Sequence, residues 1–246
     1  MSGRCVLITG SSRGIGLGIA RAFAENGDRV VLNARADAET LTQAVDTLKT
    51  EYPQASVLGL LADMSDEGAA RDCFRQVKAM FGDTDVLVNN AGDAHFGLFS
   101  DMTGSEIDRV LRNNLYSTLY ACKQAVPAMV HAKNGVIINI SSVWGVSGAS
   151  CEAVYAAAKG AVNIFTKSLA KELGPSGVRV NAIACGAFET RMNARLSTEE
   201  KSDFIDGIPL GRFGNAAEAG DLAVFLASEQ ARYLTGQIIA LDGGFL

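Results

Sequence analysis

The 246-residue sequence predicts an α/β fold in which a doubly wound, seven-stranded parallel sheet of the Rossmann type forms a single domain over residues 1–246. Three features support this prediction. Short apolar runs alternate with longer segments of helical periodicity, and the runs are apolar throughout, as in strands that helices cover on both faces. A glycine-rich turn follows the first run. No linker, repeat or low-complexity tract divides the chain, whose length suits one well-buried domain.

Strands and helices are expected to alternate along the chain. The apolar runs predicted as strands cover residues 6–9, 30–32, 56–61, 86–88, 136–140, 178–183 and 238–241. Segments with apolar residues three and four positions apart predict helices over residues 15–23, 41–48, 69–81 and 107–130, and another that carries Tyr155 and stops at Gly174-Pro175. Asn215 and Glu218 predict a capping box at a further helix start.

The composition argues against several functional classes. The net charge of -5, the pI near 5.1 and the absence of a Lys/Arg run argue against nucleic-acid binding. No stretch approaches the roughly 20 apolar residues of a membrane span, and the N-terminus leads straight into a strand instead of a secretion signal, so we expect a cytoplasmic protein. The five scattered cysteines and two distant histidines predict neither a disulfide framework nor a metal site.

The turn after the first strand is a candidate cofactor site. It reads Thr9-Gly10-Ser11-Ser12-Arg13-Gly14-Ile15-Gly16. Glycines here let the backbone approach a pyrophosphate, and the N-terminus of the following helix attracts its charge. The G-x-x-x-G-x-G spacing differs from the G-x-G-x-x-G fingerprint, and such a turn can also be purely structural. Its place in the first strand-helix unit favours dinucleotide binding.

The residues after the second strand bear on the choice of cofactor. An enzyme that uses NAD would place an acid about 20 residues beyond the turn to bind the ribose 2′-hydroxyl. This chain has Asn33-Ala34-Arg35 instead. Guanidinium groups suit phosphate, so Arg35 and Arg13 predict NADP(H), although both could also be solvated surface charges.

A candidate catalytic set lies between residues 142 and 159. Tyr155 and Lys159 are four residues apart and share one helix face. A nearby ammonium lowers the pKa of a phenol, which normally lies near 10, and such a tyrosine can exchange a proton with an alcohol or carbonyl oxygen. Ser142 follows a predicted buried strand, at the sheet edge that faces this helix. A Tyr and a Lys at this spacing also occur by chance in many helices, as a packed ring beside a solvated amine.

These motifs together resemble the short-chain dehydrogenase/reductase family over essentially the whole chain. The glycine turn fits the cofactor turn of that family, Asp63 fits its adenine contact, and Asn89-Asn90-Ala91-Gly92 fits its N-N-A-G segment. The resemblance implies hydride transfer between a nicotinamide and a carbonyl carbon. It also implies that NADP(H) contacts the following residues: Gly10, Ser12, Arg13, Gly14, Ile15, Gly16, Arg35, Asp63, Met64, Asn90, Ala91, Gly92, Tyr155, Lys159, Gly186, Phe188 and Thr190.

The resemblance also implies four catalytic roles. Asn114 would maintain a proton-relay water, Ser142 would orient the substrate oxygen and Tyr155 would be the acid/base. Lys159 would lower the Tyr155 pKa and hold the nicotinamide ribose.

The chain departs from the family pattern at two positions. Cys185 stands where a proline usually precedes Gly186, which frees one dihedral angle of the loop near the nicotinamide. Ala216 stands where a proline usually starts a helix, and we expect little effect because the capping box remains. Residues 192–209, between these positions, are expected to form a lid over the substrate.

Within the family, the motifs most resemble those of 3-oxoacyl-[acyl-carrier-protein] reductases. An acidic carrier protein requires basic residues near the mouth of the site. Lys133 stands at one position where such reductases place them, whereas Ser176 occupies the second. The segment 144–152 also resembles reductases of a ketone attached to an elongation factor. Related enzymes reduce steroids or sugars, and a regulator that senses cofactor without turnover is a further alternative.

Two helices and the C-terminus predict a homotetramer, with a dimer as the alternative. The helix 107–130 and the helix of Tyr155 carry more apolar side chains than one sheet face requires: Leu115, Leu119, Cys122, Val126, Ala161, Phe165 and Leu169. Exposed apolar patches are unfavourable in a monomer. The family resemblance implies that these helices pair across one two-fold axis and the C-terminal region across another, with Phe245 and Leu246 buried in that contact.

Overall fold

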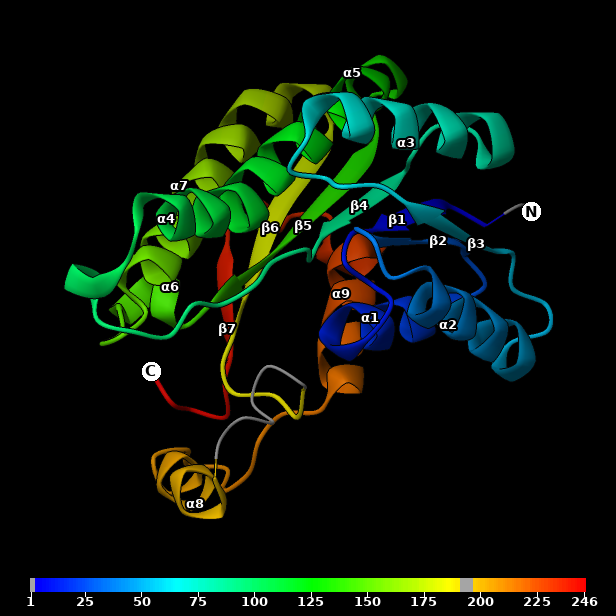
Figure 1. Ribbon diagram of the computed structural model, residues 1–246. Coiled ribbons are helices and arrows are strands. Elements are labelled where there is room, and N and C mark those ends of the chain that lie inside the picture. The colour runs from blue at the N-terminus through cyan, green and yellow to red at the C-terminus, as the bar shows by residue number, and fades with distance from the viewer. Residues whose placement is uncertain (1–2, 191–196) are drawn as a thin grey trace.

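The computed structural model describes residues 3–190 and 197–246, and its centre is one parallel sheet (Figure 1). The strand order is β3-β2-β1-β4-β5-β6-β7, and every neighbouring pair is parallel. The predicted seven-stranded, doubly wound sheet is therefore confirmed. The strands are β1 (Cys5–Ile8), β2 (Arg29–Ala34), β3 (Val57–Leu61), β4 (Val86–Asn89), β5 (Gly135–Ser142), β6 (Val178–Cys185) and β7 (Ile238–Leu241).

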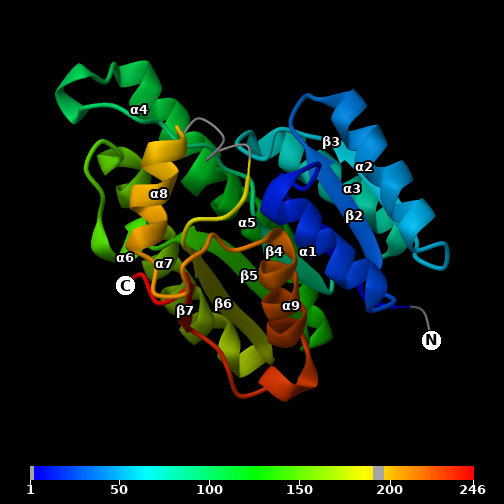
Figure 2. The same ribbon diagram turned by 90° about the horizontal axis from the view of Figure 1, so that it is seen from below.

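Helices cover both faces of the sheet (Figures 1 and 2). One face packs against α1 (Gly14–Glu25), α2 (Ala38–Glu51) and α9 (Ala216–Ala227). The other packs against α3 (Glu67–Phe81), α5 (Ser117–Ala132) and α7 (Ala153–Leu173). Shorter helices are α4 (Gly104–Leu111), α6 (Trp144–Ser147), α8 (Thr198–Asp206) and the 3-10 turns Phe99–Asp101, Gly174–Ser176 and Glu229–Ala231.

Strand β1 shows why these runs are apolar throughout. Val6 and Ile8 belong to the core beneath α1, α2 and α9, whereas Cys5 and Leu7 belong to the core beneath α3, α5 and α7. All four side chains are fully buried. Successive strand residues point to opposite faces, so a strand that helices cover on both sides needs apolar residues at every position.

The long helix expected over residues 107–130 is divided in the structure. Helix α4 leads into a five-residue π-helical turn, Arg112–Tyr116, and α5 follows it. Asn114 lies inside this wide turn, and its side-chain amide donates to the backbone oxygens of Val110 (2.9 Å) and Asp93 (2.7 Å). Such bulges interrupt a helix without a Pro or Gly to mark them, which is why the periodicity of the sequence did not reveal this one.

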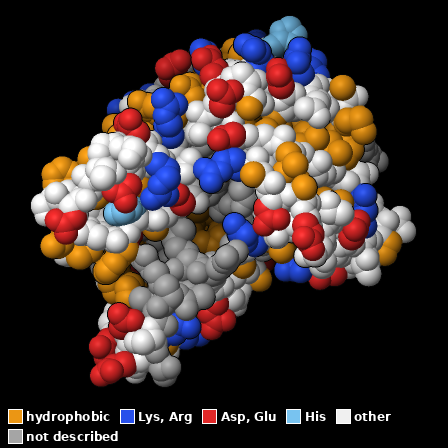
Figure 3. All heavy atoms as spheres, in the orientation of Figure 1, with side chains coloured by type: hydrophobic (Ala, Val, Ile, Leu, Met, Phe, Trp, Pro, Cys, Tyr) orange, Lys and Arg blue, Asp and Glu red, His pale blue; other side chains and the backbone are white. Residues whose placement is uncertain are grey.

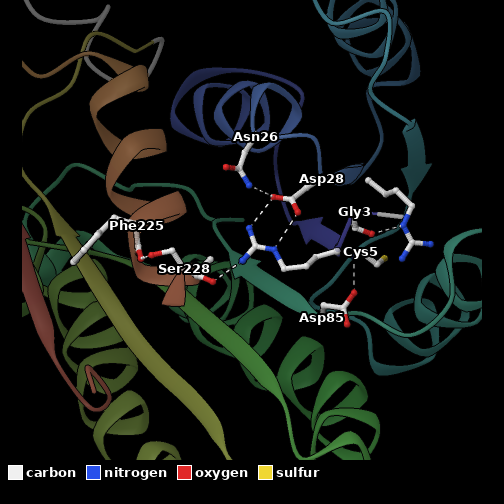
Figure 4. Close-up of polar contacts among 10 residues, drawn as sticks. Gly3, Cys5, Asn26, Asp28, Asp85, Phe225 and Ser228 are labelled. Carbon is white, nitrogen blue, oxygen red and sulfur yellow. Dashed lines mark hydrogen bonds and ion pairs between the residues drawn. The ribbon is translucent and has the colours of Figure 1, made fainter. Parts of the chain in front are cut away.

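Polar contacts tie the N-terminal segment to the amino ends of the central strands (Figure 4). The Arg4 guanidinium donates two hydrogen bonds to the Asp28 carboxylate (3.0 and 2.8 Å), and Asn26 donates a third. The Asp85 carboxylate accepts from the backbone N–H of Cys5 at 2.7 Å.

All five cysteines are free thiols. Among the described residues, no helix is long and apolar enough to cross a membrane, and no His, Cys, Asp and Glu cluster could hold a metal ion.

The structure corrects part of the argument for a tetramer. Cys122 and Leu169 are buried in the core of this chain, and Val126 and Phe165 pack partly against the same core. The C-terminal Phe245 packs against aromatic rings of its own chain. Helices stacked on a parallel sheet bury more than one stripe of side chains, so these residues do not by themselves require a second copy.

Candidate active site

The glycine turn lies at the carboxyl end of β1 and packs directly against the segment that follows β4. Gly10 has a φ of +61°, and a Cβ there would come within 2.8 Å of the Ala91 Cα. A Cβ on Gly16 would come within 2.5 Å of the Asn90 side-chain nitrogen. That nitrogen donates to the backbone oxygens of Thr9 (3.0 Å) and Gly10 (2.8 Å). Side chains larger than hydrogen at these two positions would therefore clash with the neighbouring segment and push the two segments apart.

Charged residues surround the far end of the same cavity. Arg13 contacts Asp37 at 3.6 Å, and Arg35 reaches across to donate to the Asn113 side chain at 3.2 Å. The Asp63 carboxylate accepts from the backbone and the hydroxyl of Ser65 (2.9 and 2.7 Å), which orients it after β3. Arg13 and Arg35 both line this cavity, so the two predicted selectivity residues lie at the same site.

Every residue predicted for the site lines one cavity of about 1640 Å³. These residues are Gly10, Ser12, Arg13, Gly14, Ile15, Gly16, Arg35, Asp63, Met64, Asn90, Ala91, Gly92, Asn114, Ser142, Tyr155, Lys159, Gly186, Phe188 and Thr190. Figure 3 shows the molecule hollowed on this side, with basic side chains at the rim. In a doubly wound sheet the carboxyl ends of the strands form the ligand crevice, and that rule brings these distant segments together.

The catalytic candidates lie along one wall of this cavity. Tyr155 and Lys159 are one turn apart on α7, and the Lys159 ammonium lies 5.7 Å from the centre of the Tyr155 ring. The Lys159 ammonium donates to the Ile140 backbone oxygen at 2.9 Å. Ser142 ends β5, and its hydroxyl oxygen accepts from the backbone N–H of Trp144 at 3.1 Å. The predicted approach of hydroxyl, phenol and amine to one another is therefore present.

Burial dominates the electrostatics of the catalytic pair. Desolvation raises the Tyr155 pKa, and a hydrogen bond with the Ser142 hydroxyl opposes this rise. Desolvation also lowers the Lys159 pKa from 10.5 to about 8. The expected net lowering of the Tyr155 pKa is therefore wrong for this structure, because the phenol is almost completely buried and desolvation is the largest influence on its pKa.

Asn114 lies beside the catalytic pair. It is fully buried, and among the described residues its side-chain oxygen has no hydrogen-bond partner. A Cβ on Gly92 would come within 2.5 Å of this oxygen and 3.5 Å of the Lys159 ammonium nitrogen. A buried polar atom without a partner is costly, so this oxygen marks a place where a water molecule or a cofactor atom could bind.

Several cavity residues did not emerge from sequence reasoning. Asp93 follows the N-N-A-G segment and forms an ion pair with Arg109. Its negative charge adds to the rise in the Tyr155 pKa and opposes the fall in the Lys159 pKa that burial causes. Lys201 on α8 also lines the cavity. An acid directly after the motif was the only available signal, because nothing in the sequence shows which part of α8 faces the site.

The loop after β6 carries the cysteine that replaces the usual proline. Cys185 is 5% exposed, lines the cavity and has its thiol pKa raised to about 12 by burial. Its backbone oxygen accepts from the Val143 N–H at 3.0 Å, and the Gly186 N–H donates to Leu241 at 3.0 Å. These contacts hold the strand end without a proline. Of the predicted lid over residues 192–209, residues 192–196 lie outside the described residues, and α8 follows them.

Comparison with known proteins agrees with this geometry. A family model described as enoyl-(acyl carrier protein) reductase matches residues 10–246. The chain is 37% identical to the 3-oxoacyl-[acyl-carrier-protein] reductase FabG of Chlamydia muridarum, over 98% of this chain and 96% of that protein. It belongs to the short-chain dehydrogenase/reductase family. As a member of this family, it is an oxidoreductase that acts on CH–OH and C=O groups.

Other members of the family are equally similar over their full length. FabG of Escherichia coli (strain K12) is 36% identical, over 98% of this chain and 97% of that protein. The uncharacterized oxidoreductase YmfI of Bacillus subtilis (strain 168) is also 36% identical, over 98% of both chains. The crystal structure of YwfH, an NADPH-dependent reductase involved in bacilysin biosynthesis, superposes with a TM-score of 0.92 at 29% identity, over 100% of this chain and 99% of that one.

Proposed function

We propose that this short-chain dehydrogenase/reductase is an NADP(H)-dependent ketone reductase whose substrates are 3-oxoacyl groups on an acyl carrier protein. One observation carries the catalytic part of the proposal. Ser142, Tyr155 and Lys159 lie buried on one wall of the same cavity whose other end is the glycine turn. A single cavity can therefore hold a dinucleotide and present a carbonyl to a proton donor.

The residues of the cavity fit the cofactor. Gly10 and Gly16 let the turn pack closely against Ala91 and Asn90 at the cavity edge, where the helix N-terminus would attract a pyrophosphate. Arg13 and Arg35 also line the cavity and offer two guanidiniums to a 2′-phosphate. Asp63 would meet the adenine, Lys159 the nicotinamide ribose and Thr190 the carboxamide. When bound, NADPH supplies the hydride, and the redox chemistry belongs to the cofactor.

The protein's own residues orient the carbonyl and supply the proton. The raised pKa of Tyr155 keeps its phenol protonated near neutral pH, so the phenol can donate to the substrate oxygen as an alcohol forms. The Ser142 hydroxyl would hold the same oxygen in place. Lys159, with a pKa of about 8, is charged near pH 7 and stabilises the phenolate that remains. Asn114 would hold a water that returns a proton to this pair.

The position of Lys133 restricts how an acyl carrier protein could dock. Lys133 ends α5 and lies beside Gly177, where a Cβ would come within 2.7 Å of the Lys133 oxygen. These residues precede β5 and β6 and lie at the opposite edge of the sheet from the cavity. Strand β5 spans about 23 Å at roughly 3.3 Å per residue, so the expectation that Lys133 lies near the mouth is wrong within one chain.

Two arrangements would still bring basic residues to the carrier protein. A second copy of this chain in the predicted tetramer could present its own Lys133 at the cavity. Alternatively, Lys201 on α8, which lines the cavity, could meet the acidic surface directly. Replacing Lys201 by Glu should then raise the KM for an acyl carrier protein substrate and leave the KM for the matching coenzyme A thioester unchanged. A Lys133→Glu variant distinguishes the two arrangements, because it should raise the KM for the acyl carrier protein substrate only in the first.

The reaction itself is tested by following NADPH oxidation with acetoacetyl-acyl carrier protein and acetoacetyl-coenzyme A. Turnover of the carrier-bound ketone, lost in Tyr155→Phe, is the expected result.

A second candidate function is the reduction of a different ketone. It is favoured by Ser176, which leaves one of the two docking positions without a basic side chain, and by the relatives outside the FabG group. Activity on steroids, sugars or amino-ketones without activity on either thioester would establish that alternative. NADPH binding without turnover of any ketone would indicate a regulator.

A further inference from the structure

Four aromatic rings from four distant segments meet beside the catalytic wall. Trp144 begins α6, two residues after Ser142, and Phe204 lies on α8. Phe213 precedes α9, and Phe245 is the last residue but one. Phe245 stacks on Phe204 with the ring centres 5.5 Å apart and the planes 9° apart, and the edge of Trp144 meets Phe245 at 5.5 Å.

Phe245 lies behind the surface that a substrate would touch. Trp144, Phe204 and Phe213 line the cavity, whereas Phe245 is not among the residues that line it. It contacts both Trp144 and Phe204, and Phe204 in turn meets the edge of Phe213 at 5.9 Å. The Phe245 ring therefore connects α8 to the segment that immediately follows the catalytic serine.

The C-terminal tail is itself firmly held. The Asp242 carboxylate accepts from the backbone N–H groups of Gly244 and Leu246, each at 3.0 Å. The Gly243 oxygen accepts from the Leu210 N–H at 3.1 Å. Gly243 has a φ of +69°, and a Cβ there would come within 2.7 Å of the Ile208 side chain. The tail thus packs against the segment that leaves α8, and this packing places Phe245 under the helix.

Ring contacts of Phe204 link helix α8 to Trp144, Phe213 and Phe245. Figure 1 shows it apart from the helices that cover the sheet, below the carboxyl edge. The helix is rich in charged residues, and it lines the cavity through Lys201 and the two apolar residues Phe204 and Ile205. Stacked aromatic pairs add stabilisation beyond their buried area, so the pair of Phe204 and Phe245 is the natural anchor for this helix.

We propose that Phe245 is a positioning residue, which holds α8 over the cavity so that Trp144 and Phe204 form an aromatic wall for the apolar substituent of the ketone. This inference rests on the proposed function as a ketone reductase and narrows its substrate class. The wall favours ketones with an extended or ring-shaped apolar substituent over short ones, because such a substituent has more apolar surface to place against the two rings.

The first test needs no substrate. Trp144 is the only tryptophan of the chain, so fluorescence excited at a wavelength that tyrosine does not absorb reports on this cluster alone. In Phe245→Ala the Trp144 emission should move to longer wavelength and acrylamide should quench it more strongly, whereas Phe245→Tyr should resemble the wild type. Leu246→Ala, which truncates the exposed neighbouring side chain, is the matched control. Identical emission and quenching in wild type and Phe245→Ala would refute the packing role, whether or not any ketone is reduced.

The second test compares two ketones in steady state. For a ketone with a bulky aromatic substituent, Phe245→Ala should raise KM by roughly ten-fold, the scale of a lost aromatic contact. The kcat for acetoacetyl-coenzyme A and the affinity for NADPH should change by less than about two-fold, because Tyr155, Lys159 and the glycine turn are untouched. Phe245→Tyr should restore KM. An equal rise in KM for both ketones, or a Tyr variant as impaired as the Ala variant, would overturn the proposal. Wild-type protein that reduces no ketone would instead refute the proposed function.

Discussion

Replacing Lys159 by Met should make the protein more stable while abolishing its activity. Lys159 is 5% exposed, and burial lowers its pKa from 10.5 to about 8. A pKa difference of this size corresponds to about 3 kcal/mol, which is the cost of keeping the ammonium charged in the folded chain. Met is similar in length and carries no charge. It loses the hydrogen bond to Ile140, worth about 1 kcal/mol, so the net gain at pH 7 is about 2 kcal/mol.

The dependence on pH follows from the direction of the pKa change. Below pH 8, Lys159 is charged in both the folded and the unfolded chain, and the full cost is present. Between pH 8 and 10.5 the folded chain has released this proton while the unfolded chain retains it, so the wild-type contribution to stability rises. At about pH 9.5 roughly 2 kcal/mol of the cost is removed, and the two proteins should be almost equally stable.

Urea unfolding at one fixed chain concentration measures this difference. Lys167→Met is the matched control, because Lys167 is an exposed lysine on the same helix and its replacement should leave stability unchanged within about 0.5 kcal/mol. Burial raises the pKa of four thiols to about 12. Those of Cys5, Cys73 and Cys122 are not influenced by Lys159 and cancel in the comparison. Lys159 lowers the pKa of the Cys185 thiol, so that pKa should rise further in the Met variant. A Met variant that is less stable than wild type, or a difference that does not change with pH, would refute the reasoning.

Four further outcomes are expected. Tyr155→Phe should lower kcat by about 10²-fold or more with NADPH affinity nearly unchanged, and near-normal turnover would exclude Tyr155 as the proton donor. Ala34→Asp, at the cavity end of β2, should shift the cofactor preference from NADPH towards NADH, because a carboxylate there repels a 2′-phosphate. Wild-type protein that already uses both cofactors equally well would contradict this prediction. Gly92→Ala should impair turnover because its Cβ would lie 2.5 Å from the Asn114 oxygen, and unchanged kinetics would show that this wall is free to move. Light scattering should give the mass of a tetramer, and a mass near 25.8 kDa would contradict the prediction.

The sequence by itself determined the sheet, the glycine turn and the strand ends that surround the cavity. Apolar runs specify strands buried on both faces, and the order of strands in a doubly wound sheet places every carboxyl end at one edge. Residues that follow different strands, such as Gly10, Asp63, Asn90 and Ser142, must therefore lie around one cavity. These features depend on local pattern and on chain topology, both of which the sequence displays.

Only the tertiary structure decided how these groups influence one another. The π-helical turn at Asn114 depends on a contact with Asp93, and the raised pKa of Tyr155 depends on how completely the fold removes water from it. The C-terminal Phe245 packs on Phe204 of its own chain, a contact that no sequence pattern indicated. Desolvation and ring packing are sums over neighbours from distant segments, so no periodicity or spacing along the chain encodes them.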